Sequence, residues 1–448
     1  MNEDEQTVEH RPAREAHRAL GLWSIRRALT FAFSTAIVLL VGAWLFISWL
    51  LGSPAQAKPK PLDTAVQLEL LKLVFALVAG VGALVALVTA YRRQRVDEAA
   101  GERAERIQAH AERVARDIAY DATERRVTDL YGQAVEQLGH DKAAVRLGGL
   151  YSLERLAQDH PDHRQTVTDV ICAYLRMPFQ FPSPATQENH GNRHDPADTA
   201  RQELQVRLAA QRLLKRHLAT PPQQDHPVTY WDDMQIDLTG AHLVHFNFSN
   251  CRPVQAIFIG ANFTGDADFN AAQFCGDARF YGAQFSGNAR FYEAQFSRMP
   301  GFGGAQFGGD AGFYGAQFSG DARFYEAQFR GNADFNKVQF SGDANFNGAQ
   351  FSQVANFYEA LFLGSARFYG AKFSGDVNFN RAQFSEDASF DRTQFCGDAN
   401  FNEAQFQHEP TFVSAAASYP NDAHVWPTLW RVEPASLDNN LAHLIREQ

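Results

Sequence analysis

The feature that most constrains this chain is a regular spacing of phenylalanine between residues 263 and 412. The spacing alternates between five and six residues, so the repeating unit has eleven residues. The unit from Asp277 to Gly287 reads Asp-Ala-Arg-Phe-Tyr-Gly-Ala-Gln-Phe-Ser-Gly, and thirteen such units lie between Asp266 and His408. A chain with this period must bury the same side chains in one unit after another.

Spacings of five and six fit neither a helix nor a plain strand. On a helix, successive Phe residues would lie on different faces, and in a strand a step of five reverses the side-chain direction. A ribbon that bends once per block points every Phe inward, with the Ala two residues earlier beside it. The fixed period therefore predicts a solenoid. We expect left-handed turns where Gly and then Asp or Asn follow the second Phe.

Two units are needed to close one coil. Eleven residues span at most about 36 Å, which is too short a perimeter to enclose two Phe and two Ala. A coil of about 22 residues has four sides and encloses four Phe and four Ala, stacked in columns about 4.8 Å apart. Each buried ring contributes about 2–3 kcal/mol, against a large loss of chain entropy.

Before this array the spacing is five throughout, from Leu238 to Phe263. The blocks Ile-Asp-Leu-Thr-Gly, Ala-His-Leu-Val-His and Ala-Asn-Phe-Thr-Gly resemble the pentapeptide-repeat family, whose motif is Ala-(Asp/Asn)-Leu-x-x. The resemblance covers about residues 236–412 and implies a right-handed, four-sided β-helix. The extra residue in alternate blocks departs from the strict motif.

Two apolar segments precede the repeat. Residues 28–52 carry no charge and are long enough to cross a bilayer, and a second run, residues 70–91, carries Lys72 near one end. Arginines flank the outer ends of both runs, so the positive-inside rule places both chain termini in the cytoplasm. We expect a two-span α-helical hairpin in the cell membrane. Cleavage by signal peptidase after Ala57 is the less favoured alternative, because the first run exceeds a signal-peptide core.

Helical segments link the hairpin to the repeat. Residues 96–138 are charged and lack Pro, and their apolar residues follow a 4-3-4 spacing, which predicts a stalk helix. Dimerisation through this helix and packing on the next helices both stay open, since two heptads are too few for a coiled coil. Residues 142–176 predict two helices broken at Pro161, which form a helical-repeat-like module. Its segment from 144 to 176 resembles a region of actinomycete membrane proteins that carry pentapeptide repeats. Residues 199–218 predict another amphipathic helix.

The expected organisation has five parts. These are a cytosolic segment (1–27), the transmembrane hairpin (28–91), the helical stalk and module (92–220), the β-helix (221–412), and a C-terminal cap and tail (413–448). An uncapped solenoid leaves unpaired edges, so we expect apolar residues to cover both ends. The candidates are Tyr230 and Trp231 before the first coil, and Val425, Trp426, Leu429 and Trp430 after the last. We interpret the final fifteen or so residues as a loose tail.

No motif predicts catalysis or a cofactor. The chain lacks a phosphate loop and the GxSxG, HExxH and GxGxxG motifs. Residues 159–163, together with His190 and His194, lie at a helix break or in a linker, and we interpret them as solvated rather than metal-binding. The Asp or Asn in each unit favours turn chemistry over calcium binding. Four scattered cysteines indicate a reduced, cytosolic set.

The outer surface of the solenoid is the candidate interaction site. Gln precedes alternate Phe residues and would form ladders up two faces, while Tyr follows the other Phe residues. The candidate residues are Tyr281, Tyr292, Tyr314, Tyr325, Tyr358, Tyr369, Gln284, Gln295, Gln317 and Gln328. Two interpretations stay open: the surface binds another protein, or the ladders only stabilise the coils.

We therefore expect a membrane-anchored, non-enzymatic scaffold that binds an unidentified protein on the cytosolic side. A homodimer is the other partner that the sequence allows. The alternative is a DNA mimic that binds a topoisomerase, as some pentapeptide-repeat proteins do. Residues 236–412 hold 18 Asp and Glu against 11 Lys and Arg, but interspersed Arg breaks any continuous acidic stripe. No nucleic acid is expected as a partner.

Overall fold

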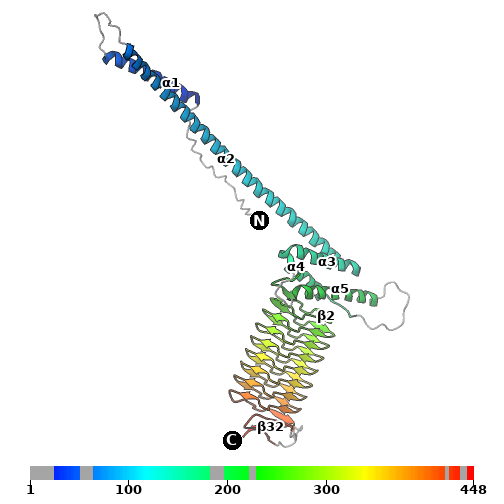
Figure 1. The fold of residues 1–448 in the computed structure, drawn as a ribbon. Coiled ribbons are helices and arrows are strands. Elements are labelled where there is room, and N and C mark those ends of the chain that lie inside the picture. The colour runs from blue at the N-terminus through cyan, green and yellow to red at the C-terminus, as the bar shows by residue number, and fades with distance from the viewer. Residues whose placement is uncertain are drawn as a thin grey trace, which may run out of the picture. The chain divides into compact units, whose positions relative to one another are not determined.

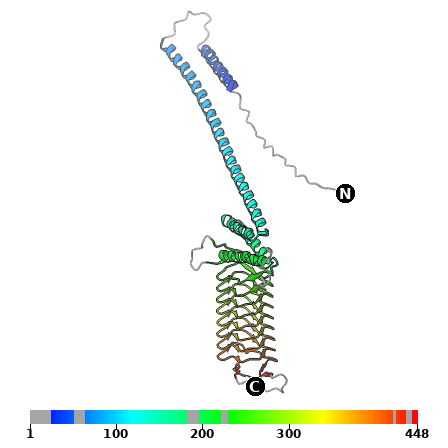
Figure 2. The same ribbon diagram turned by 90° about the vertical axis from the view of Figure 1, so that its right-hand side faces the viewer.

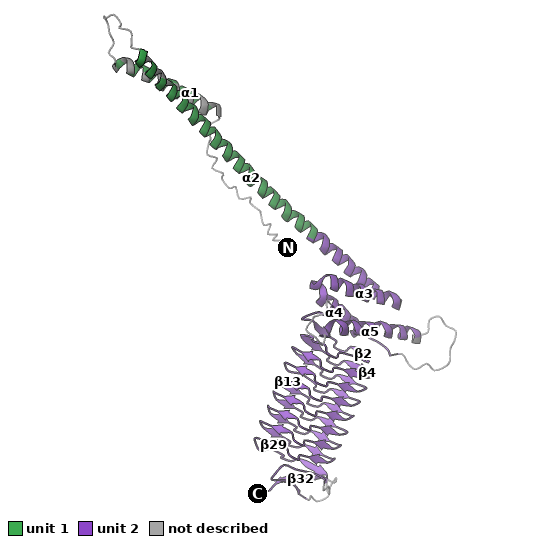
Figure 3. Cartoon of the chain, viewed as in Figure 1, with its two compact units in different colours: residues 1–119 green, residues 120–448 purple. Residues whose placement is uncertain are grey.

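The computed structural model describes residues 25–50, 64–181, 196–220, 229–418, 423–433 and 441–447. The chain divides into two compact units, Met1–Ala119 and Tyr120–Gln448 (Figure 3). The boundary between the units falls inside one long helix.

Helices form the described part of the first unit. They are α1 (Ile25–Leu50) and the first part of α2 (Thr64–Leu138), which ends in the second unit (Figure 1). The segments predicted as a second span and a stalk are one continuous helix, because no Pro interrupts residues 64–138. Residues 51–52 of the predicted first span, and Ala57, lie outside the described residues.

Within the described residues, one helix is long and apolar enough to cross a membrane. It is the part of α2 from Phe75 to Leu138, whose most apolar window is not buried anywhere in the structure. Leu84 and Leu87 in this stretch are 63% and 69% exposed, so their apolar surface has no protein cover in the described part of the chain.

The second unit begins with a small helical module. The end of α2 packs with α3 (Ala143–Asp159), the 3₁₀ turn η1 (Pro161–His163), α4 (Arg164–Arg176) and α5 (Pro196–Leu218). The predicted break at Pro161 is confirmed, since Pro at the start of η1 separates α3 from α4.

The apolar residues that follow the 4-3-4 spacing in the predicted stalk helix behave differently in the two halves of that helix. Val127, Ala134 and Leu138 are buried in the helical module, so packing on the next helices accounts for three of the four residues in the second half of the pattern, while Leu130 is 43% exposed. Ile107 and Ile118, from the first half, are 70% and 64% exposed. The structure leaves dimerisation through this half as a prediction.

Four columns of short parallel strands form the faces of the solenoid, which stack coil on coil in both views (Figures 1 and 2). Face I contains β5 (Ala267–Asp268), β9 (Ala289–Arg290), β12 (Ala311–Gly312), β16 (Ala333–Asp334), β20 (Ala355–Asn356), β24 (Val377–Asn378) and β28 (Ala399–Asn400). Face II contains β6 (Gln273–Phe274), β10 (Gln295–Phe296), β13 (Gln317–Phe318), β17 (Gln339–Phe340), β21 (Leu361–Phe362), β25 (Gln383–Phe384) and β29 (Gln405–Phe406).

Faces III and IV complete each circuit. Face III contains β1 (Gln235–Asp237), β3 (Gln255–Ile257), β7 (Ala278–Arg279), β14 (Ala322–Arg323), β18 (Ala344–Asn345), β22 (Ala366–Arg367) and β26 (Ala388–Ser389), with Gly301 bridging β7 and β14. Face IV contains β2 (His242–Val244), β4 (Asn262–Thr264), β8 (Gln284–Phe285), β11 (Gln306–Phe307), β15 (Gln328–Phe329), β19 (Gln350–Phe351), β23 (Lys372–Phe373), β27 (Gln394–Phe395) and β30 (Ala416–Ser418).

The strand register confirms the predicted coil. Phe296 of β10 pairs with Phe318 of β13, one coil of 22 residues later, and the solenoid makes about 8 turns at about 22 residues per coil. In the first coil the step is shorter, since Leu243 pairs with Phe263. Strict five-residue blocks therefore close a coil of 20 residues, and the extra residue in alternate blocks lengthens each later coil by two.

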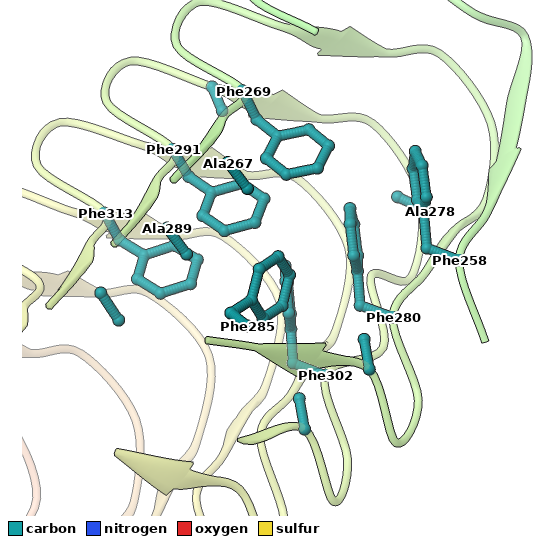
Figure 4. Packing of buried hydrophobic residues seen from close by; sticks show 14 of the residues in the cluster. Phe258, Ala267, Phe269, Ala278, Phe280, Phe285, Ala289, Phe291, Phe302 and Phe313 are labelled. Atoms are coloured by element: carbon teal, nitrogen blue, oxygen red, sulfur yellow. The ribbon is translucent and has the colours of Figure 1, made fainter. Parts of the chain in front are cut away.

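Phenylalanine rings fill the interior in columns (Figure 4). Phe269, Phe291 and Phe313 are fully buried and stack with ring centroids 4.7–4.8 Å apart and planes within 2° of parallel. A ring from the opposite column, Phe280, meets Phe291 edge to face at 5.5 Å. The Ala two residues before each Phe, such as Ala289, is also buried, so the predicted inward positions are confirmed.

The predicted position of the left-handed turn is wrong for the regular units. The left-handed residue is the second after the first Phe, as in Gly282 (φ 63°), Glu326 (57°) and Arg381 (58°). The Gly two residues after the second Phe is needed for close approach instead: a Cβ at Gly331 would lie 2.4 Å from the carbonyl carbon of Gly309 in the preceding coil. The extra residue widens this corner, which then turns without left-handed geometry.

Helices close the first end of the solenoid. The side-chain amide of Gln211 in α5 donates to the carbonyl of Val244 at 2.8 Å, and its oxygen accepts the Val244 N–H at 2.9 Å. Gln165 in α4 makes the same pair of bonds to Gln235, both at 2.9 Å. Each glutamine therefore satisfies backbone groups that an edge strand would otherwise leave open.

Aromatic rings complete this cap. Tyr230 and Trp231 are buried, as predicted, and the Trp231 ring stacks on His217 of α5 with centroids 4.0 Å apart. The predicted helix over residues 199–218 is α5, and its last turn holds His217 against the first coil.

The predicted cap of the last coil is partly wrong. Trp426 and Trp430 pack against Phe412, with ring centroids 6.1 Å and 4.9 Å away. Val425 and Leu429, predicted to cover the same end, are 42% and 47% exposed. Val425 contributes its backbone instead, because its carbonyl accepts the N–H of Phe401.

The interpretation of the last fifteen or so residues as a loose tail is wrong for residues 441–446, while residues 434–440 lie outside the described part of the chain. Strand β32 (Leu441–Arg446) pairs antiparallel with β30 of face IV and with β31 (Trp430–Glu433). Ala442 and Leu444 alternate inward and are 1% and 5% exposed. Burial of every second residue is typical of a strand. The strand was not predicted because six residues are too few to make this alternation clear in the sequence.

Candidate interaction surface

Side chains between faces bond successive coils together. Asp266 accepts the backbone N–H of Asn288 at 3.1 Å, Asn288 accepts that of Asp310 at 2.9 Å, and Asp310 accepts that of Asn332 at 2.9 Å. The Asn288 N–H, with the guanidinium of Arg290, lowers the pKa of Asp266. The oxygens of this Asp and Asn column therefore serve the backbone of the next coil.

Glutamine ladders run along faces II and IV. Gln295 and Gln317 lie in register on face II, and Gln284 and Gln328 lie two coils apart on face IV. Gln328 is half-buried and the other three are exposed. The four candidate glutamines therefore fall on opposite faces of the coil and cannot form one contact surface.

The candidate tyrosines separate in the same way. They form two columns at the corners that follow faces I and III. The corner after face I holds Tyr292, Tyr314 and Tyr358, and the corner after face III holds Tyr281, Tyr325 and Tyr369. Since an eleven-residue step moves half a circuit, tyrosines in neighbouring units, such as Tyr281 and Tyr292, lie on opposite sides of the solenoid.

Several of these rings rest on neighbouring coils. A Cβ at Gly312 would lie 2.2 Å from Cε1 of Tyr292, so that ring lies against a glycine. Arg381 donates to the Tyr358 hydroxyl at 3.0 Å, and Arg392 lies over the Tyr369 ring at 5.3 Å. The tyrosines thus contribute to packing between coils, while Tyr292, Tyr314, Tyr325 and Tyr369 keep 38–44% of their surface exposed.

A shallow hollow of about 400 Å³ lies where face II meets the first tyrosine column. Gln295, Gln317 and Tyr314 line it together with Glu293 and Lys337. Amide, phenol and both signs of charge make this a polar surface suited to hydrogen bonding with another protein.

Ion pairs neutralise most of the solenoid arginines that stand two residues before a tyrosine. Arg279 pairs with Asp277 at 2.7 Å, and Arg290 pairs with Asp266 at 2.8 Å. Arg367 pairs in the same way with an Asp of the preceding coil. The acidic residues on these faces therefore face cations of the same protein.

A buried polar network holds the helical module. Glu203 pairs with Arg146 at 3.1 Å and with Arg207 at 2.8 Å, and it accepts the hydroxyl of Tyr174 at 2.7 Å. Arg207 is 2% exposed and donates to the carbonyl of Leu175 at the end of α4. Burial and the Glu203 carboxylate raise the pKa of Tyr174. This network orients α5 against α4, and thus Gln211 against the solenoid.

The described residues hold no group of three or more His, Cys, Asp and Glu arranged for a metal ion. His160 and His163 lie edge to face with ring centroids 6.3 Å apart. His190 and His194 lie outside the described residues. All four cysteines are free thiols, and burial raises the pKa of Cys172 and of Cys251 to about 12.

Sequence reasoning missed two sets of residues. The edge-capping glutamines, Gln165 and Gln211, lie in amphipathic helices where a polar residue gives no signal. Arg323 is one of the interspersed arginines that break the acidic stripe, and it differs from Arg290 and Arg367 because a Met, not an Asp, stands 24 residues before it. That departure from the repeat was visible in the sequence.

Two family profiles match the solenoid. One, described as pentapeptide repeats in nine copies, matches residues 255–295, 280–328, 324–372 and 368–415, and the other, with eight copies, matches residues 236–265. No curated protein and no solved structure matches the chain. The profiles and the four-faced stack of coils agree over the same stretch. Residues 236–415 therefore belong to the pentapeptide-repeat family, and they fold as a β-solenoid.

Proposed function

We propose that this protein is a membrane-anchored platform on which another protein docks, and that it acts by binding rather than by catalysis. The observation that carries the proposal is the pairing of a helix, Phe75–Leu138, whose most apolar window is uncovered, with a solenoid whose outward side chains differ from coil to coil. The first feature favours a bilayer and the second favours recognition of a partner.

We also propose that residues 28–52 and 70–91 both cross the cell membrane, with the two chain termini in the cytoplasm. The supports are the uncharged first run, which overlaps α1, and the arginines that flank both runs. In this arrangement the part of α2 beyond Tyr91 continues on the cytoplasmic side as far as Leu138.

The docking partner contacts the outer faces of the solenoid rather than its interior, which Phe and Ala fill completely. Half-exposed tyrosines beside glutamine ladders offer rigid aromatic surface and amide donors on two opposite corners. Mimicry of DNA is less well supported. Arg279 and Arg290 hold neighbouring carboxylates in ion pairs, which weakens the continuous negative field that a nucleic-acid mimic needs.

Membrane attachment is tested on the full chain in cells. We expect the protein to remain in the membrane pellet after an alkaline carbonate wash, and a variant lacking residues 28–91 to appear in the supernatant. Reporter fusions at the two termini are expected to be active on the cytoplasmic side. Recovery of the intact chain in the soluble fraction would contradict the anchor.

A further inference from the structure

One unit of the solenoid departs from the others. Residues 299–309 read Met-Pro-Gly-Phe-Gly-Gly-Ala-Gln-Phe-Gly-Gly. Met299 stands in the column where the coils on either side have Asp277 and Asp321, and Pro300 replaces the usual buried Ala. The outward positions on both sides of the buried Phe are glycine, so this coil has a bare stretch on face III.

Two tyrosines from the coils above and below cover this stretch. A Cβ at Gly301 would lie 2.1 Å from Cζ of Tyr281, and a Cβ at Gly303 would lie 2.4 Å from Cζ of Tyr325. The two rings, two coils apart along the solenoid, come to 6.3 Å between centroids with planes 34° apart. The glycines are therefore what allows Tyr281 and Tyr325 to converge.

Arg323 lies beside this aromatic pair and differs from its counterparts. Arg290 and Arg367 each pair with an Asp 24 residues earlier, and the corresponding position for Arg323 is Met299. Its guanidinium instead lies 3.5 Å from the Tyr281 hydroxyl and 3.4 Å from the Met299 sulfur. Asp321 stands two residues before Arg323, as Asp277 does before Arg279, but in the described part of the chain neither it nor any other carboxylate forms an ion pair with Arg323 within 4.0 Å.

We propose that Tyr281, Met299, Arg323 and Tyr325 form a docking site for an acidic side chain of a partner protein. Met299 is 47% exposed and Tyr325 is 38% exposed, so an approaching chain reaches both. Tyr, Met and Arg are the residue types that interface cores favour over the rest of a protein surface. The inference rests on the proposed docking function and assigns its partner's chemistry.

The fold itself indicates a carboxylate as the ligand of Arg323. At equivalent positions, Asp oxygens lie 2.8 Å from the Arg290 and Arg367 guanidinium groups, which shows that a carboxylate fits there. Met299 removes the internal carboxylate and leaves a weak sulfur acceptor in its place. An Asp or Glu of the partner would restore the charge-assisted bond, and apolar neighbours would pack on Met299 and the two rings.

The test uses the full chain in detergent micelles and a phage-displayed library of random short peptides. We expect the selected peptides to contain Asp or Glu next to an apolar residue. Synthetic versions carrying a fluorophore then report affinity by fluorescence anisotropy. Replacement of the acidic residue in the peptide by its amide is expected to weaken binding roughly tenfold or more.

Three variants separate the site from the rest of the surface. Met299→Asp supplies the internal carboxylate again, and Arg323→Gln removes the cation, so both are expected to weaken peptide binding roughly tenfold or more. Arg367→Gln changes the same residue type on the same face and is expected to leave the affinity unchanged. Far-UV circular dichroism melts are expected to match across the three variants.

Other results would overturn the site. Peptides that bind Met299→Asp as tightly as the natural chain, or that carry no acidic residue, contradict it, as does a library from which nothing is enriched. An oligonucleotide whose binding is lost in the same variants would show that nucleic acid, not protein, is the partner. The carbonate wash reports membrane attachment independently, so the anchor stands or falls on a separate measurement.

Discussion

The interior and the outer surface of the solenoid follow opposite rules. Inside, every ring of the column from Phe258 to Phe412 is fully buried, and the column repeats with little change. Outside, the position before Phe on face III changes from Arg279 to Gly301 to Arg323 in successive coils. Repetition inside specifies the architecture, whereas variation outside leaves each coil free to carry its own contacts.

The largest test of this comparison removes one interior ring. Phe324→Ala is expected to lower the free energy of unfolding by about 3–5 kcal/mol, because the cavity cannot collapse between two stacked neighbours. Tyr358→Ala on the outer surface is the matched control, with an expected loss below about 1 kcal/mol. Urea titrations of the full chain in micelles, followed by far-UV circular dichroism, measure both. Equal losses would contradict the comparison.

The end of the interior stack offers the next test. Gln211→Leu keeps the side-chain size but leaves the N–H and carbonyl of the buried Val244 without partners, and we expect a loss of about 2–4 kcal/mol. Gln284→Leu, on the exposed ladder of face IV, is expected to change stability by less than about 0.5 kcal/mol. Hydrogen exchange at Val244 distinguishes a frayed first coil from global unfolding. An unchanged exchange rate in the first variant would argue against edge capping by Gln211.

Substitutions at the two kinds of corner are expected to change the stability of the protein in opposite directions. Gly342→Ala places a Cβ 2.7 Å from the carbonyl carbon of Gly320, and we expect a loss of about 1–3 kcal/mol. Glu326→Gly relieves a left-handed residue (φ 57°) and is expected to raise stability by about 1 kcal/mol. Shifts of the thermal midpoint measure both. A stabilising Gly342→Ala would mean that successive coils separate more easily than their close contact indicates.

The smallest effect concerns the thiols and involves no loss of stability. Burial raises the pKa of Cys172 and Cys251 to about 12, so roughly one thiol in ten thousand is ionised at pH 8. Cys275 and Cys396 lie at outer corners and are partly exposed. Iodoacetamide at pH 8, read by mass spectrometry, is expected to modify the outer pair and spare the buried pair. Added urea is expected to make all four react.

The sequence predicted the parts of the fold that repeat. Phe and Ala spacings determine which side chains face inward, and the chain length per coil follows from the perimeter needed to enclose them. The left-handed position was misassigned because Gly serves two purposes in one unit. Gly331 prevents a clash with the coil before it, whereas Gly282 turns the chain.

The parts that occur once were harder to predict. Strand β32 is six residues long and pairs with a strand far away in the sequence, so local pattern gave little signal. The six candidate tyrosines were predicted as one surface, but the half-circuit step divides them between opposite corners. Arg323 could have been found from sequence, since Met299 stands 24 residues before it where Arg290 and Arg367 have Asp.

The half-circuit step also bears on how such a chain can change length. Duplicating a single eleven-residue unit keeps the buried pattern intact, but it rotates every later coil by half a turn. Outward side chains that were aligned before and after the insertion then point to opposite sides of the solenoid. Duplicating two units lengthens the solenoid and keeps the outward side chains of all four faces aligned. Growth by 22 residues therefore preserves an existing binding stripe, while growth by eleven moves it to the other side at little energetic cost.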